Sequence, residues 1–85
     1  MQYCLAVFKS RNETLYLAKM IMTSGYHAGI INTPREIGVA CGISVQFSEN
    51  IVAIVRGYIK SKPFRSFVGV FRVEKINGRF FVERI

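Results

Sequence analysis

Short apolar runs alternate with two longer amphipathic segments along the chain, a pattern that predicts strands separated by helices. Tyr3–Phe8 is an apolar run with aromatic and β-branched members, as expected of a buried strand. Apolar side chains then recur at helical spacing over about Glu13–Ser24. Ser10 or Asn12 can cap this helix, and Gly25 follows its end, where a left-handed residue is favoured.

The remainder of the chain follows the same logic. Ser48 can cap a second helix that Pro63 would stop. Asn77-Gly78 is a two-residue hairpin turn between two apolar runs. The predicted elements are a strand at His27–Ile31, a strand at Ile43–Phe47, a helix at about Glu49–Ser61, a strand at Phe64–Lys75 and a strand at Arg79–Ile85.

This order, βαββαβ with one more strand, predicts an α+β fold of the ferredoxin-like split βαβ type. Two helices would cover one face of an antiparallel sheet with strand order 4-1-3-2, and the C-terminal hairpin would add its strand outside the fourth. The other face would be left open, with Tyr3, Phe67 and Phe71 as candidates to line one face or the other. The length of 85 residues fits a single domain over 1–85.

The composition points to a reduced compartment and to a partner. Apolar residues make up 51% of a chain of only 85 residues, so some apolar surface should stay outside the core and favour a homodimer. Two cysteines do not make a disulfide scaffold. No basic leader and no apolar run of about 20 residues is present, so we expect a cytoplasmic protein without a membrane span.

The charge is strongly positive. Twelve Lys and Arg face five Glu, with a formal net charge of +7. This balance favours nucleic acid, phosphorylated ligands, small oxyanions or an acidic protein surface, although it also keeps an apolar protein soluble.

The predicted topology gathers many of these cations at one edge of the sheet. The end of the first strand, the loop before the third strand, the end of the second helix and the start of the fourth strand share that edge. The N-terminus of the first helix also points there, with unpaired N–H groups from about Glu13 onward. A thiol there, such as that of Cys41, should ionise more readily. The cations expected at this edge are Lys9, Arg11, Arg35, Lys60, Lys62 and Arg65.

The segment T-P-R-E-I-G-V-A-C-G places Cys41 after a short helical turn. Thr33 can cap this turn, Pro34 suits its first position, and Glu36 can reach back to complete a capping box. Gly42 then allows a left-handed exit into the next strand. A rigid miniature helix that holds one thiol suggests thiol chemistry, although free cysteine is also an ordinary packing residue.

The longer stretch N-T-P-R-E-I-G-V-A-C-G-I-S-V-Q-F resembles the signature of the selenium/sulfur carrier protein-like family, a small bacterial family formerly described as a domain of unknown function. Gly38, Val39 and Ala40 stand where members commonly have hydroxyl residues before the cysteine, and the basic C-terminal hairpin is also less typical. The residues that match the T-P-R-E-x4-C-G motif are Thr33, Pro34, Arg35, Glu36, Cys41 and Gly42.

The resemblance implies a carrier of sulfur or selenium. A donor of the cysteine desulfurase type would place the atom on Cys41, and an acceptor protein would receive it. Gly42 would allow close approach, and Arg35 could supply positive charge or instead pair with Glu36 or Glu49. No general base stands out, so we expect a carrier or binding protein without turnover of its own and without a cofactor.

Two other functions fit the sequence. An RNA- or nucleic-acid-binding module would use exposed aromatics on the open sheet face together with the basic edge. A dimeric regulatory module would bind a small anion at that edge.

The other cysteine, Cys4, is predicted to be a core residue, and His27 is predicted to be structural. No metal-ligand set can therefore be assembled.

Overall fold

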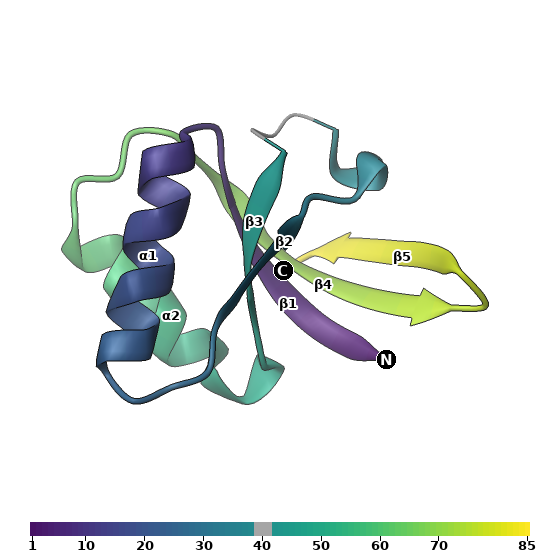
Figure 1. The fold of residues 1–85 in the computed structure, drawn as a ribbon, viewed down its shortest axis with the longest axis horizontal. Coiled ribbons are helices and arrows are strands. Elements are labelled where there is room, and N and C mark those ends of the chain that lie inside the picture. The colour runs from purple at the N-terminus through teal and green to yellow at the C-terminus, as the bar shows by residue number, and fades with distance from the viewer. Residues whose placement is uncertain (39–41) are drawn as a thin grey trace.

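A five-stranded antiparallel sheet carries both helices of the protein on one face (Figure 1). The computed structural model describes residues 1–38 and 42–85. The elements are β1 (Gln2–Phe8), α1 (Arg11–Thr23), β2 (Gly29–Asn32), the 3-10 turn η1 (Arg35–Ile37), β3 (Ile43–Phe47), the 3-10 turn η2 (Glu49–Ile51), α2 (Val52–Ser61), β4 (Phe67–Ile76) and β5 (Arg79–Arg84).

The strands lie in the order β2-β3-β1-β4-β5. This confirms the predicted α+β fold, a ferredoxin-like arrangement with an added strand outside the fourth. The central strand β1 pairs with β3 and β4, and Cys4 lies opposite Phe47 on one side and Arg72 on the other. The ends of β1 and β2 and the starts of β3 and β4 therefore share one edge of the sheet.

Every second side chain of β1 enters a core between the sheet and the helices. Cys4, Ala6 and Phe8 are fully buried there and pack with residues such as Leu17 and Val55 of the two helices. The prediction that Cys4 is a core residue is confirmed.

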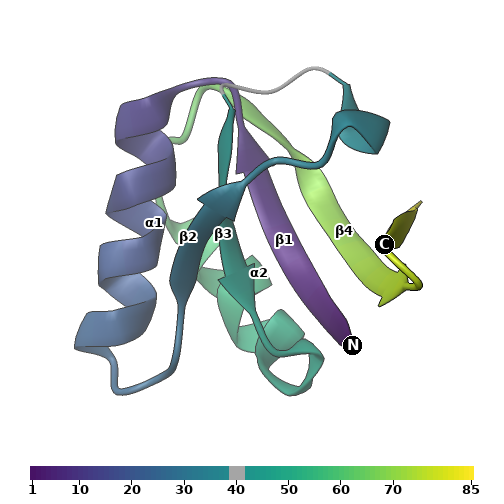
Figure 2. The same cartoon turned by 45° about the vertical axis from the view of Figure 1, so that its right-hand side comes forward.

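The intervening side chains of β1 enter a second core on the other face, so the expectation of an open sheet face is wrong. Tyr3, Leu5 and Val7 are buried there together with Phe71 and Val73 of β4. The reason is that the C-terminal hairpin and η1 cover this face, and β5 lies against η1 (Figure 2). The covering side chains include Ile37, Phe80 and Val82.

The ends of the elements follow the sequence signals in part. The Ser10 side chain caps α1 by accepting the Glu13 N–H at 3.3 Å, and Gly25 after the helix has φ +92°. The hairpin turn at Asn77 and Gly78 has positive φ at both residues, as an Asn-Gly turn predicts. The predicted cap at Ser48 is wrong, because its side chain makes no capping bond and the chain first forms η2, so that α2 begins at Val52.

In the described ranges, neither helix has the length and apolar character that a membrane crossing requires.

We expect the second core to contribute as much to stability as a core covered by helices. Leu5→Ala should lower the free energy of unfolding by about 2–5 kcal/mol, because Leu5 is fully buried and leaves a cavity. The matched control is Leu15→Ala on α1, where the side chain is 43% exposed and the change should stay within about 0.5 kcal/mol. Urea denaturation of both variants measures the difference, and equal losses would contradict a buried second face.

Candidate functional site

The loop between β2 and β3, residues 33–42, carries the T-P-R-E and C-G residues and is called the motif loop below. Its base is closed by hydrogen bonds. The Thr33 N–H donates to the Gly42 carbonyl at 2.9 Å, directly beyond the last strand pair, Asn32 opposite Ile43. Cys41, the predicted thiol, lies outside the described residues, as do Val39 and Ala40. The described part of the site consists of the residues on either side of Cys41, 33–38 and 42–44.

The Thr33 hydroxyl is bonded across the base of the loop. Its Oγ1 lies 2.5 Å from Oγ of Ser44, which is fully buried at the start of β3. The predicted capping box is thus wrong: Pro34, not Thr33, occupies the N-cap position of η1, and no side chain caps this turn. The physical reason is that Ser44 offers the Thr33 hydroxyl a buried partner.

Two glycines with positive φ flank the undescribed part of the loop. Gly38 has φ +88° and Gly42 has φ +96°, so the predicted left-handed exit at Gly42 is confirmed. A Cβ at either position would meet no atom of residues 1–38 and 42–85 within 4 Å. The requirement for glycine is therefore conformational, and any other residue would strain the backbone there.

The short turn η1 is tied to the second core. Ile37 packs with that core, and Pro34 is buried, while Arg35 and Glu36 are exposed. Figure 2 shows η1 near the C-terminal hairpin and apart from both helices. Arg35, the first residue of η1, therefore belongs to an element that contacts β5 and lies apart from the helices that carry Arg11 and Lys60.

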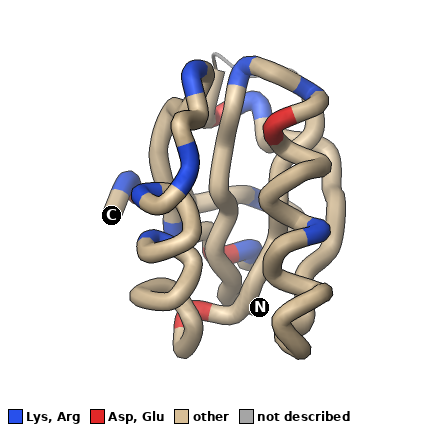
Figure 3. Tube along the Cα trace, turned by 90° about the vertical axis from the view of Figure 1, so that its left-hand side faces the viewer, with Lys and Arg blue, Asp and Glu red and all other residues tan. Residues whose placement is uncertain are grey.

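Several of those cations surround the start of α1. The Lys9 N–H donates to the Ser66 carbonyl, Arg65 directly precedes Ser66, and Lys62 lines a hollow with Glu13. Arg11 is the first residue of α1, and Lys60 lies in the last turn of α2. Figure 3 shows several Lys and Arg at the upper end of the molecule, with others spread along the rest of the chain.

Glu13 is the residue at this edge that sequence reasoning missed. Its carboxylate accepts the N–H groups of Arg65 and Ser66, each at 2.9 Å, and the Ser66 hydroxyl at 2.5 Å. The Ser66 hydroxyl bond and the Arg65 N–H bond hold the pKa of Glu13 below its ordinary value. The S-R-N-E order of residues 10–13 signals a capped helix start. Nothing local signals a partner 53 residues away.

The same network corrects the expectation of unpaired helix N–H groups from Glu13 onward. The Glu13 N–H is taken by the Ser10 hydroxyl, and the Thr14 N–H donates to the Ser10 carbonyl. The start of α1 is thus bonded from within the protein.

Glu49, one of the partners considered for Arg35, is bound elsewhere. Arg72 donates through Nε to Glu49 at 3.0 Å and through Nη1 to Glu83 at 2.8 Å. These bonds lower the pKa of Glu49 and raise that of Arg72.

Burial is the main cause that raises the pKa of the Cys4 thiol. The Glu49 charge raises it further, while the Arg72 charge lowers it. Cys4 is thereby held as an inert thiol.

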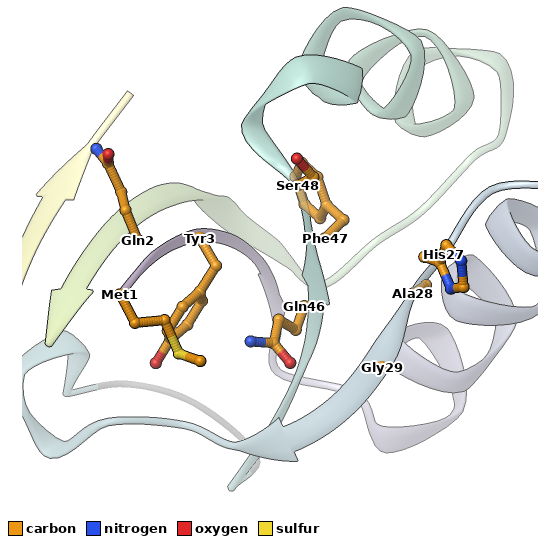
Figure 4. Close-up of a pocket in the computed structure, with 9 residues that line it drawn as sticks. All are labelled: Met1, Gln2, Tyr3, His27, Ala28, Gly29, Gln46, Phe47 and Ser48. Carbon is orange, nitrogen blue, oxygen red and sulfur yellow. The ribbon is translucent and has the colours of Figure 1, made fainter.

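A hollow of about 400 Å³ lies at the opposite end of the sheet, between the start of β1 and the end of β3 (Figure 4). Tyr3, Gln46 and Ser48 contribute polar groups to its lining, and His27 lies at its rim. Among the described residues, its lining includes none from the motif loop. Over residues 1–38 and 42–85, no three His, Cys, Asp or Glu side chains gather in a way that could hold a metal ion.

A family model described as "Putative Se/S carrier protein-like" matches residues 3–66. The chain belongs to this Se/S carrier-like family. No curated protein and no solved structure matches this chain.

The Se/S carrier-like match extends from β1 through the motif loop and α2 to the turn before β4. It therefore includes every residue from Thr33 to Gly42 and the Glu13–Ser66 contact. Strands β4 and β5 follow the matched residues, although β4 pairs with the central strand and β5 supports η1.

The hydroxyl pair at the base of the motif loop can be tested by substitution. Thr33→Val should lower the free energy of unfolding by about 1–3 kcal/mol, because it leaves the buried Ser44 hydroxyl without this partner. Thr33→Ser keeps the hydroxyl and should cost less. Glu36→Ala should stay within about 0.5 kcal/mol of the wild type, whereas a capping box, in which the Glu36 side chain accepts the N–H of the cap residue, predicts a larger loss of stability. Chemical denaturation of the variants decides between the two arrangements.

Glu13 should make folding sensitive to acid. Its pKa is lower in the folded protein, so its stabilising contribution is complete above about pH 4.5, the ordinary value, and is lost as the pH falls through the lower folded value. Glu13→Gln should therefore be less stable than wild type at pH 7, and the difference should shrink below pH 4.5.

Unfolding curves across this pH range measure the effect, with Glu74→Gln on the exposed part of β4 as the matched control. A constant difference between Glu13→Gln and wild type at all pH values would show that the carboxylate charge is not involved.

Proposed function

We propose that this protein carries a sulfur or selenium atom on Cys41, receiving it from a donor of the cysteine desulfurase type and passing it to an acceptor protein. The observation that carries this proposal is the family match, which spans the entire T-P-R-E-x4-C-G segment. The chain has two cysteines, and Cys4 is fully buried in the helix-side core. Cys41 is accordingly the thiol left for exchange with another protein.

The chemistry requires only thiolate exchange. The Cys41 thiolate attacks the outer sulfur of a persulfide on the donor. The donor S–S bond breaks, the donor cysteine leaves as a thiolate, and a new S–S bond forms on Cys41. The electrons balance without an external oxidant or reductant, and a selenium atom would move through the same steps. Transfer to the acceptor repeats the exchange with the acceptor thiolate as the attacking group.

The described flanks of Cys41 suit this exchange. The Thr33–Gly42 and Thr33–Ser44 bonds fix the base of the loop, so the chain leaves β2 and enters β3 at set positions. Gly42, the next residue after Cys41, is exposed and has no side chain to obstruct an approaching sulfur atom. The surplus of cations favours an anionic thiolate or persulfide over its protonated form.

Two of the three aromatic residues considered for RNA are covered. Tyr3 and Phe71 are only 8% and 7% exposed under the hairpin and η1. Phe67 is 39% exposed, and its ring packs 5.4 Å from that of Phe8, which belongs to the helix-side core. A small anion bound at the start of α1 could not use the N–H groups of Glu13 and Thr14, because both are bonded to Ser10. Homodimer formation and a cytoplasmic location stay predictions.

Intact-protein mass spectrometry tests the proposal after incubation with a cysteine desulfurase and either cysteine or selenocysteine. Wild type and Cys4→Ala should gain one sulfur or selenium atom that a reductant removes, and Cys41→Ser should gain none. Cys4→Ala is the matched control, because it removes the other thiol. A gain that persists in Cys41→Ser, or no gain in wild type while the same donor loads another acceptor, would contradict the proposal.

A further inference from the structure

A groove runs along the exposed side of α1, next to the turn that follows α2. It consists of two hollows of about 420 and 450 Å³, which adjoin because both are lined by Tyr16 and Lys62. Lys19 and Met20 line one hollow, and Pro63 and Phe64 line the other. None of the described residues of the motif loop lines this groove.

The floor of the groove is a row of aromatic rings anchored in the core. The Tyr16 ring meets Phe64 edge-on with centroids 5.9 Å apart, and Phe64 lies 5.0 Å from the fully buried Phe8. Tyr16 is nevertheless 50% exposed. An exposed aromatic ring that is already held in place loses little conformational freedom on binding, which is typical of the residues that dominate protein interfaces.

The charges around this floor are positive. Lys19 and Lys62 line the groove, and the acidic residue that also lines it, Glu13, has both carboxylate oxygens bonded to Arg65 and Ser66. A second copy of this chain would bring a net charge of +7 to the same surface, so self-association there is disfavoured.

We propose that this groove docks an acidic segment of a partner protein, with an apolar side chain packed over Tyr16 and carboxylates facing Lys19 and Lys62. The apolar floor and the two lysines that line the groove, Lys19 and Lys62, favour a protein segment, because nucleic acids gain affinity mainly from a track of many phosphate contacts. The docking surface is independent of any reaction at Cys41.

Fluorescence anisotropy with the full chain tests this docking surface. The probes are a labelled acidic peptide with a central leucine–phenylalanine pair, the same peptide with serine–glycine in place of that pair, and labelled poly-uridine. The leucine–phenylalanine peptide should bind, and replacing the pair should weaken binding by about tenfold. Tyr16→Ala should cause a similar loss.

Lys62→Glu should also weaken the leucine–phenylalanine peptide by about tenfold at low salt, and less as salt screens the charges. The matched control is Lys75→Glu, an identical change of charge on the far hairpin, which should alter affinity by no more than about twofold. Lys62→Glu keeps the test decisive if Tyr16→Ala does not fold.

Several results would overturn the docking proposal. One is equal affinity for the two peptides or equal losses in Lys62→Glu and Lys75→Glu, which would reduce binding to net charge. Another is poly-uridine binding that exceeds peptide binding and depends on Tyr16. The last is a dimer in sedimentation analysis that Tyr16→Ala dissociates, which would make a second copy the occupant.

Discussion

The central strand β1 is the constraint on which the rest of the structure depends. Its residues from Tyr3 to Phe8 are all buried, and its side chains alternate between a core under the helices and a core under the hairpin. Because the period of a strand is two, a shift of one residue would exchange the two sets. The pairing of Ala6 with Val45 and Val70 sets the register of β3 and β4 against β1. This register determines the position of the sheet edge from which the motif loop extends.

The two cores have different consequences for the candidate site. The helix-side core encloses Cys4 and removes that thiol from exchange chemistry. The second core takes in Ile37 of η1 and so holds one side of the motif loop, while Thr33 and Ser44 hold its base. The hairpin that completes this second core follows the residues shared with the family, which makes β5 an addition that supports the loop from outside the matched segment.

The sequence predicted what depends on local pattern and on chain order. The apolar run of β1, the Ser10 cap, the Asn77-Gly78 turn and the strand order all follow from such signals. Two kinds of contact could not be read from it. The Thr33 hydroxyl had a plausible local role in a capping box, yet Ser44 in the next strand binds it. The coverage of the second face and the Glu13–Ser66 bonds join segments far apart in the chain, and their register exists only once the sheet has formed.

The most direct test of this account is the rate at which iodoacetamide alkylates each cysteine in the folded protein, assigned by peptide mass spectrometry. The account predicts that Cys41 is modified in the native state. Cys4 should be modified only through unfolding and at a rate that rises with added urea, because it is fully buried in the helix-side core. Alkylation of Cys4 as fast as Cys41 without denaturant, or a native Cys41 that resists the reagent, would contradict the claim that the fold leaves one thiol for exchange.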